Sequence, residues 1–185
     1  MRYANKISAL RIITIPFFIY SIINYNPGHE YFRLIALGIF FLAVVSDALD
    51  GMIARLKNEN TALGPIIDPL ADKLLLISTY ITLYLKGAAL GSIILPLWVV
   101  LVVVARDLIM LFGTFLIFVV RQHIKIIPTS WGKLTTGLQM ATIVSVLLQF
   151  EISFIFWTIA VMLTIISGFD YMRKGLKLLL FEGAK

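Results

Sequence analysis

The chain has 185 residues, of which 60% are hydrophobic and 14% are charged. A soluble domain is roughly half apolar and about a quarter charged, so this composition excludes an ordinary soluble domain and also excludes disorder. The absence of cysteine excludes disulfides, thiolate nucleophiles, zinc–thiolate sites and iron–sulfur clusters. The formal net charge of +6 fits the basic cytoplasmic loops of a membrane protein better than nucleic-acid binding, for which we find no motif.

Apolar runs separated by short polar turns indicate membrane-spanning helices, each of which needs about 20 predominantly apolar residues. In chain order the runs are Ile12–Ile23, Leu34–Ser46, Leu74–Leu85, Gly87–Ala105, Leu108–Val120, Leu134–Phe150 and Ile152–Phe169. Some runs reach full length only by including polar neighbours. The polar turns between them are Asn24–Glu30, Lys57–Thr61, Lys86–Gly87, Arg121–Lys133 and Gln149–Glu151. The first turn makes the first two runs a hairpin.

The stretch Gly91–Val120 is interrupted by Arg106 and Asp107, and it fits either one long helix or two spans. A single helix leaves only Arg33 and Lys86 on the side of the membrane opposite the other loop cations. Because basic residues collect in cytoplasmic loops, we predict one long helix that protrudes into the cytoplasm, six spans in all and both termini cytoplasmic.

The sequence thus predicts an all-α integral membrane protein with six transmembrane helices, located in the cell membrane. We expect a single membrane-embedded domain over residues 1–185. The terminal segments Met1–Leu10 and Arg173–Phe181 mix basic and apolar residues, which is typical of helices that lie on a membrane surface. We therefore expect interfacial segments at both ends of the chain.

Four aspartates lie at or inside the ends of the second and third predicted spans, where a charged side chain costs about 2.5–3.5 kcal/mol on insertion scales. Asp47 and Asp50 are three residues apart on one face of the second helix, and Asp68 and Asp72 are four apart on one face of the third. The two helices are antiparallel and joined by a short loop, so the pairs are expected to face each other at similar depth. Carboxylate ligands suit Mg²⁺, Mn²⁺ or Ca²⁺ rather than zinc or copper.

The alternative interpretation is that these acids pair with Arg55 or Lys73 or cap helix ends. One aspartate favours that alternative, but four aspartates on two facing helices favour a metal site. The neighbouring Arg55 and Lys73 oppose cation passage through a channel and suit a phosphate-bearing ligand. Gly51 and Ala54 leave a notch of small residues beside the acids, although close helix packing explains such a notch as well.

Together these residues form the pattern Asp47-x-x-Asp50-Gly51-x-x-Ala54-Arg55, eight residues, Gly64-x-x-x-Asp68-x-x-x-Asp72. The pattern resembles the signature of the CDP-alcohol phosphatidyltransferase family at every motif position. The chain length, the six spans and the cytoplasmic termini are also similar to that family. Weaker matches resemble its phosphatidylglycerophosphate synthase branch, at Asn5, Arg11, Asp68–Lys73, Ala105–Asp107, Gly132–Thr136 and Gln139.

The resemblance implies that CDP-diacylglycerol gives its phosphatidyl group to an alcohol and that CMP leaves, at a site facing the cytoplasm. It implies two divalent ions, Mg²⁺ or Mn²⁺, held by Asp47, Asp50, Asp68 and Asp72. It implies that Asp72 also takes the proton from the acceptor hydroxyl. The residues that it places at the CDP group are Gly51, Ala54, Arg55 and Gly64. It also implies a homodimer.

The branch resemblance implies glycerol 3-phosphate as the acceptor, and an anionic acceptor calls for cations beside the acids. The cations that we expect at its phosphate are Lys133, Arg106, Arg121 and Lys125. A positive-inside loop explains Arg121 and Lys125 equally well, and Arg106 has a possible partner in Asp107. The alternatives are a cardiolipin synthase or an enzyme with another alcohol acceptor and, outside enzymes, a divalent-cation transporter.

Overall fold

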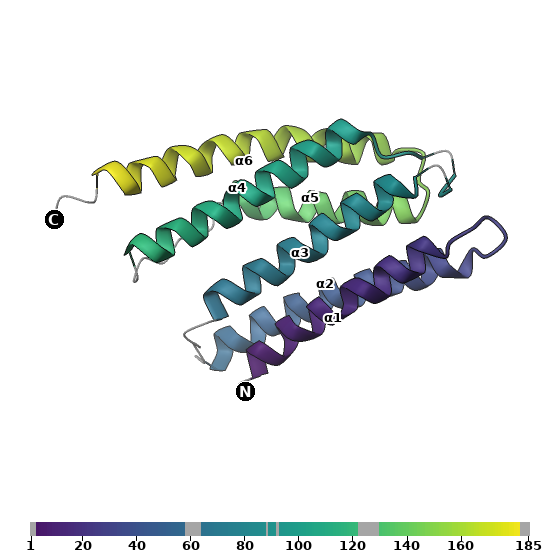
Figure 1. The fold of residues 1–185 in the computed structure, drawn as a ribbon, viewed down its shortest axis with the longest axis horizontal. Helices are drawn as coiled ribbons and strands as arrows, with labels where there is room; N and C mark the ends of the chain where they lie inside the picture. The colour runs from purple at the N-terminus through teal and green to yellow at the C-terminus, as the bar shows by residue number, and fades with distance from the viewer. Residues whose placement is uncertain (1–2, 58–63, 88, 92, 122–129, 182–185) are drawn as a thin grey trace.

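The computed structural model describes residues 3–57, 64–87, 89–91, 93–121 and 130–181, which form six α-helices and no strand. The helices are α1 (Tyr3–Ile23), α2 (Tyr31–Lys57), α3 (Gly64–Leu85), α4 (Leu97–Arg121), α5 (Ser130–Leu147) and α6 (Ser153–Phe181). They run along the long axis of an elongated bundle, and the first and last helices place both chain ends at the same end of it (Figure 1). The end of α2 and the start of α3 lie at that end too (Figure 1).

The helix order confirms the predicted hairpin and the predicted single long helix. The turn at Asn24–Glu30 separates α1 from α2, and α4 continues through Arg106 and Asp107 without a break. The long helix begins at Leu97 rather than at Gly91. Pro96 explains this start, because the residue before a proline is disfavoured in the α conformation.

The predicted interfacial segments at the two ends continue directly into the neighbouring helices, and their place at the membrane surface stays a prediction. Tyr3–Leu10 is the first part of the continuous helix α1, and Arg173–Phe181 is the last part of α6. Alternating basic and apolar residues describe the faces of a helix, but they do not show whether a bend separates it from its neighbour. No proline interrupts either junction, so the helical backbone continues through both.

Among the described residues, two helices contain a stretch that is long and apolar enough to cross a membrane. These stretches are Leu97–Phe115 in α4, with a mean hydropathy of 2.1, and Ser153–Lys174 in α6, with a mean hydropathy of 1.7. Only 28% of the 18-residue apolar window in each stretch is buried, whereas the core helix of a soluble protein is mostly buried. Large apolar side chains such as Phe112 and Phe169 are 70% and 71% exposed, as expected where lipid replaces water.

The packing places α1 and α5 beside both helices that carry the predicted acids. Contacts join α1 to α2 and α3, and α5 to α2, α3 and α6, while α4 contacts α3 and α6. Among the described residues, α2 and α3 do not contact each other directly. The apolar core includes Phe18, Phe40, Leu76 and Tyr80, which are at most 1% exposed. The acid-bearing ends of α2 and α3 are thus positioned through their neighbours.

Candidate functional site

The structure places the predicted acids on two helices whose ends lie together. Asp47 and Asp50 belong to the second half of α2, and Asp68 and Asp72 belong to the first half of α3. Both segments lie at the end of the bundle that holds the two termini (Figure 1). Asp72 is half-buried, while the side chains of residues 47–69 lie outside the described part. The antiparallel arrangement agrees with the expectation, and the convergence of the four carboxylates stays a prediction.

The residues predicted at the CDP group belong to the same two helix ends. Gly51, Ala54 and Arg55 follow Asp50 within α2, and Gly64 is the first residue of α3. The structure assigns these four residues to helices, but it does not describe their side chains. Both of these helices contact α1 and α5.

The donor set of this region fits a hard divalent cation. It offers carboxylate oxygens, the chain has no cysteine, and His29 lies in the turn between α1 and α2 at the opposite end of the bundle. In the part of the chain with described side chains, no group of three His, Cys, Asp or Glu forms a competing metal centre. Oxygen-only ligands suit Mg²⁺ or Mn²⁺, so the residues present fit the predicted metal.

A buried charge network lies directly beside Asp72. The ammonium of the next residue, Lys73, donates to Asp107 Oδ1 at 3.0 Å, and Arg106 Nη1 donates to the same oxygen at 2.7 Å. Asp107 is fully buried, and the two cations are 8% and 5% exposed. Unpaired charges in such surroundings are costly, so the three groups stabilise one another only as a set.

The network continues into α5 and α6. Arg106 Nη2 donates to Ser167 Oγ of α6 at 2.6 Å, and Lys73 Nζ lies 3.4 Å from Thr136 Oγ1 of α5. Side chains of α3, α4, α5 and α6 are thereby joined around one carboxylate. Sequence reasoning noted the neighbours Arg106 and Asp107 but missed Lys73 and Ser167 as their partners. The sequence signal for the Lys73 pairing is that ionisable side chains inside apolar helices pair with one another.

The four predicted acceptor cations have different surroundings. Lys133 lies in the first turn of α5, is exposed, and makes no ion pair with any described residue. It shares a helix face with Thr136, three residues further on, and Thr136 contacts Lys73. Arg106 instead is buried, with both terminal nitrogens bound inside the protein. Arg121 is the last residue of α4, with an undescribed side chain, and Lys125 lies outside the described residues.

Two other residues of α5 serve helix packing. The Thr135 hydroxyl donates to the carbonyls of Trp131 and Leu163, at 2.8 and 3.2 Å. Gln139 is fully buried, and its backbone carbonyl accepts the Tyr80 hydroxyl at 3.2 Å. These contacts explain the polar residues of α5 by helix association, which in membranes uses such hydrogen bonds. Thr135 therefore has no hydroxyl proton left for an acceptor phosphate.

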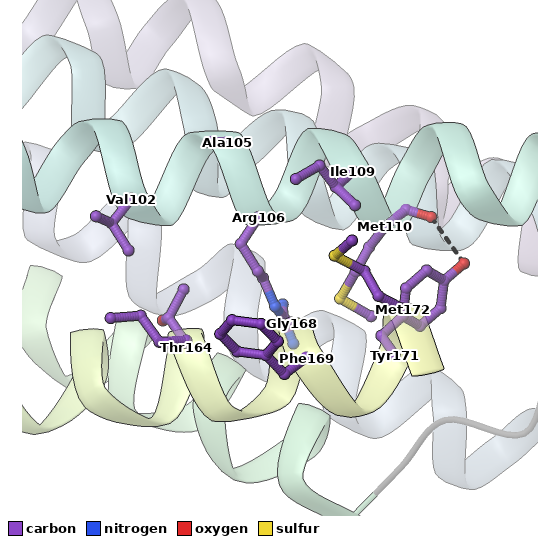
Figure 2. Close-up of a pocket in the computed structure, with 11 residues that line it drawn as sticks. Val102, Ala105, Arg106, Ile109, Met110, Thr164, Gly168, Phe169, Tyr171 and Met172 are labelled. Carbon is purple, nitrogen blue, oxygen red and sulfur yellow. Dashed lines mark hydrogen bonds between the residues drawn. The ribbon is translucent and has the colours of Figure 1, made fainter. Parts of the chain in front are cut away.

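A cavity of about 270 Å³ lies between α4 and α6, and all of its lining residues belong to these two helices. Figure 2 shows Arg106 reaching from α4 toward Gly168 of α6, with Ile109, Met110 and Met172 around the space. Tyr171 closes one side, where its hydroxyl donates to the Met110 carbonyl at 3.2 Å (Figure 2). Its lining is mainly apolar, so the cavity lacks the convergent acids and hydroxyls that the predicted chemistry needs.

Comparison with known proteins identifies the class. Residues 1–166 match the CDP-alcohol phosphatidyltransferase family. The chain is similar to a probable phosphatidylglycerophosphate synthase of Mycobacterium tuberculosis, with 31% identity over 94% of this chain and 81% of that protein. It is 29% identical to a CDP-diacylglycerol–glycerol-3-phosphate 3-phosphatidyltransferase of Aquifex aeolicus, over 98% of this chain and all of that protein. A cardiolipin synthase (CMP-forming) of Streptomyces coelicolor is 34% identical over 64% of this chain and 51% of its own length.

The all-helical fold with exposed apolar faces and the match to this family together identify an integral membrane protein. The chain belongs to the CDP-alcohol phosphatidyltransferase family, which confirms the resemblance seen in its motif. It is therefore a transferase of phospholipid biosynthesis, and membership of an enzyme family argues against the cation transporter.

Proposed function

We propose that the chain transfers the phosphatidyl group of CDP-diacylglycerol to glycerol 3-phosphate, giving phosphatidylglycerophosphate and CMP. The observation that carries this choice of acceptor is the contact between Lys73 and Thr136. It brings α5 against α3 at the turn that carries Asp72, and the exposed cation Lys133 lies one helical turn away on the same face of α5. This proposal therefore gives an anionic acceptor an exposed cation on the helix that meets α3 near the proposed base.

The similarity to relatives supports the same acceptor. The relatives named as a probable phosphatidylglycerophosphate synthase and as a CDP-diacylglycerol–glycerol-3-phosphate 3-phosphatidyltransferase match over 94% and 98% of this chain, whereas the cardiolipin synthase matches over 64% of it. A cardiolipin synthase remains the second candidate on the strength of that partial match. Its acceptor is a lipid, which needs a second apolar groove rather than a cation beside the acids.

In the proposed site, Asp47, Asp50, Asp68 and Asp72 hold two divalent ions, Mg²⁺ or Mn²⁺. When bound, such ions stabilise the attacking and leaving oxygens of an in-line displacement at phosphorus. The carboxylate of Asp72 takes the proton from the acceptor hydroxyl. The half-buried position of Asp72 and its place one residue before the buried network support this role, because a base must be held still to act on one hydroxyl.

In this proposal, the donor and the acceptor are bound by residues of different helices. Gly51, Ala54 and Arg55 of α2, with Gly64 of α3, line the CDP group, and the planar guanidinium of Arg55 holds two oxygens of the pyrophosphate. Lys133 binds the acceptor phosphate, with Arg121 and Lys125 as further cations from the connection between α4 and α5. Arg106 supports this region through Asp107 and Ser167, since both of its terminal nitrogens are already bound there.

We further propose that all six helices span the membrane, with both termini and the acid-bearing helix ends on the cytoplasmic side. The common end of the termini and the acid-bearing helix ends supports this orientation (Figure 1). The concentration of Lys and Arg in the helix ends there, such as Arg55, Lys57, Arg121 and Lys133, supports it as well. CDP-diacylglycerol has a water-soluble CDP head and an insoluble lipid tail, so its site belongs near that interface. A homodimer stays a prediction from the family resemblance.

The proposal is tested by CMP release from CDP-diacylglycerol by the purified protein in detergent, with separate glycerol 3-phosphate, phosphatidylglycerol, serine and inositol reactions. We expect CMP release with glycerol 3-phosphate and none in an Asp50→Asn control. Release with phosphatidylglycerol instead makes the chain a cardiolipin synthase. Cation flux in liposomes without CMP release revives the transporter alternative.

A further inference from the structure

Asp107 is the shared counterion of two buried cations on different helices. Its Oδ1 atom accepts from Lys73 Nζ at 3.0 Å and from Arg106 Nη1 at 2.7 Å, and the whole residue is fully buried. Among the described residues, Asp107 is the one anion within ion-pair distance of either cation. The ammonium of Lys73 therefore has its charge balanced from α4, across the helix interface.

The ion pair between Lys73 and Asp107 matters because Lys73 lies next to the predicted metal ligands. Lys73 follows Asp72 directly, and Asp68 lies five residues earlier on the same helix. A lysine ammonium is a compact charge on a flexible four-carbon stem, and it moves to the nearest anion when its partner is lost. Inside an apolar environment that attraction is strong, because few water dipoles screen it. The structure holds Lys73 on the side of α3 that meets α4 and α5, through Asp107 and Thr136.

We propose that Asp107 is a positioning residue, which holds the ammonium of Lys73 on the α4 side of α3 and keeps it away from the carboxylates that bind the metal. The inference rests on the proposed function, since it takes Asp68 and Asp72 to be metal ligands. Asp107 touches neither substrate in this account. It acts through Lys73 by leaving the negative charge of the neighbouring acids available to the divalent ions.

The test is a double-mutant cycle read by calorimetric titration of the purified full-length protein with Mn²⁺. Asp107→Asn keeps the shape of the side chain and removes its charge. We expect at least about fivefold weaker Mn²⁺ binding, within the coupling that such cycles measure for groups in contact. Lys73→Met alone is expected to bind Mn²⁺ no more weakly than wild type. The double variant is expected to bind within about twofold of wild type, because it has no ammonium to release.

A matched control exists on α6, where Lys174 Nζ lies 2.8 Å from Asp170 Oδ2 on an exposed surface. Asp170→Asn also removes the carboxylate of a lysine ion pair, and it is expected to leave Mn²⁺ binding unchanged. Asp107→Glu retains the charge and is expected to bind Mn²⁺ within about twofold of wild type. This second variant keeps the test decisive where Asp107→Asn does not fold, since a fivefold loss in Asp107→Glu overturns the inference.

The outcomes separate this inference from the proposed function. Equal Mn²⁺ affinity in Asp107→Asn and wild type rejects the positioning role and leaves the metal site standing. A double variant as weak as Asp107→Asn shows that Asp107 acts through the fold and not through Lys73, which also rejects it. A wild-type protein that releases CMP but binds no Mn²⁺ rejects the proposed metal site, and this inference with it.

Discussion

The ring of Tyr171 on α6 lies directly over Gly113 on α4. A Cβ atom at Gly113 would come within 2.9 Å of Tyr171 Cε1 and 3.0 Å of its hydroxyl oxygen. The ring is held in this place because its hydroxyl bonds Thr114 Oγ1 at 3.0 Å and the Met110 carbonyl at 3.2 Å. The absence of a side chain at Gly113 therefore sets how closely α4 and α6 approach, as small residues do in membrane helix pairs.

Gly113→Ala is expected to destabilise the protein by about 1–3 kcal/mol, the usual cost of overpacking a fixed contact. The matched control is Gly137→Ala on α5, where a Cβ would meet nothing within 4 Å. That control is expected to be neutral or stabilising by up to about 1 kcal/mol, because alanine favours helix over glycine. Thermal unfolding in detergent measures both. Equal melting temperatures for the two variants would show that the Tyr171 ring moves aside freely.

Removal of divalent metal is expected to abolish CMP release. Four carboxylates in one place repel one another unless cations lie between them, and oxygen ligands bind Mg²⁺ and Mn²⁺. Treatment with EDTA followed by addition of either ion, with CMP release measured at each step, checks this expectation. Full activity after thorough chelation would reject the metal site.

Asp72→Asn is expected to lower kcat far more than it weakens donor binding. An amide has nearly the shape of the carboxylate but does not accept the hydroxyl proton in the transition state. The measurements are CMP release under saturating substrates and direct binding of CDP-diacylglycerol. Near wild-type turnover in this variant would assign the general base elsewhere, and some loss of metal binding is expected alongside.

Arg55→Lys is expected to weaken donor binding by about 1.5–3 kcal/mol, the range for hydrogen bonds to charged groups. The planar guanidinium holds two phosphate oxygens at once, and an ammonium acts as a single point of charge. The KM for CDP-diacylglycerol at saturating acceptor measures the effect. An unchanged KM would place the Arg55 side chain away from the pyrophosphate.

Lys133→Ala is expected to raise the KM for glycerol 3-phosphate about tenfold or more, while the KM for CDP-diacylglycerol stays nearly unchanged. The physical reason is the loss of the exposed cation at the start of α5, where the helix N-terminus also favours an anion. Lys86→Ala is the control, because Lys86 follows the far end of α3. Equal acceptor saturation in both variants would move the cardiolipin synthase to first place.

The sequence predicts the helices well because apolar runs and polar turns alternate clearly along it. The single long helix α4 follows from the charge distribution, and the family follows from the aspartate motif. The pairing of Lys73 with Asp107 is beyond such reasoning, because it depends on the rotation and depth of α3 relative to α4. The continuous ends of α1 and α6 are equally hidden, since amphipathic composition does not reveal a bend.

The unequal lengths of the last two helices affect the membrane around the proposed site. At a rise of 1.5 Å per residue, the 18 residues of α5 extend about 27 Å and the 29 residues of α6 about 43 Å. A hydrocarbon layer of about 30 Å exceeds the first length and falls short of the second. A spanning α5 therefore draws the surrounding lipid thinner, which lowers the water boundary toward Lys133. In the proposed function, this thinning would give the water-soluble acceptor a shorter path to its lipid-bound donor, and would tie turnover to the chain length of the host lipids.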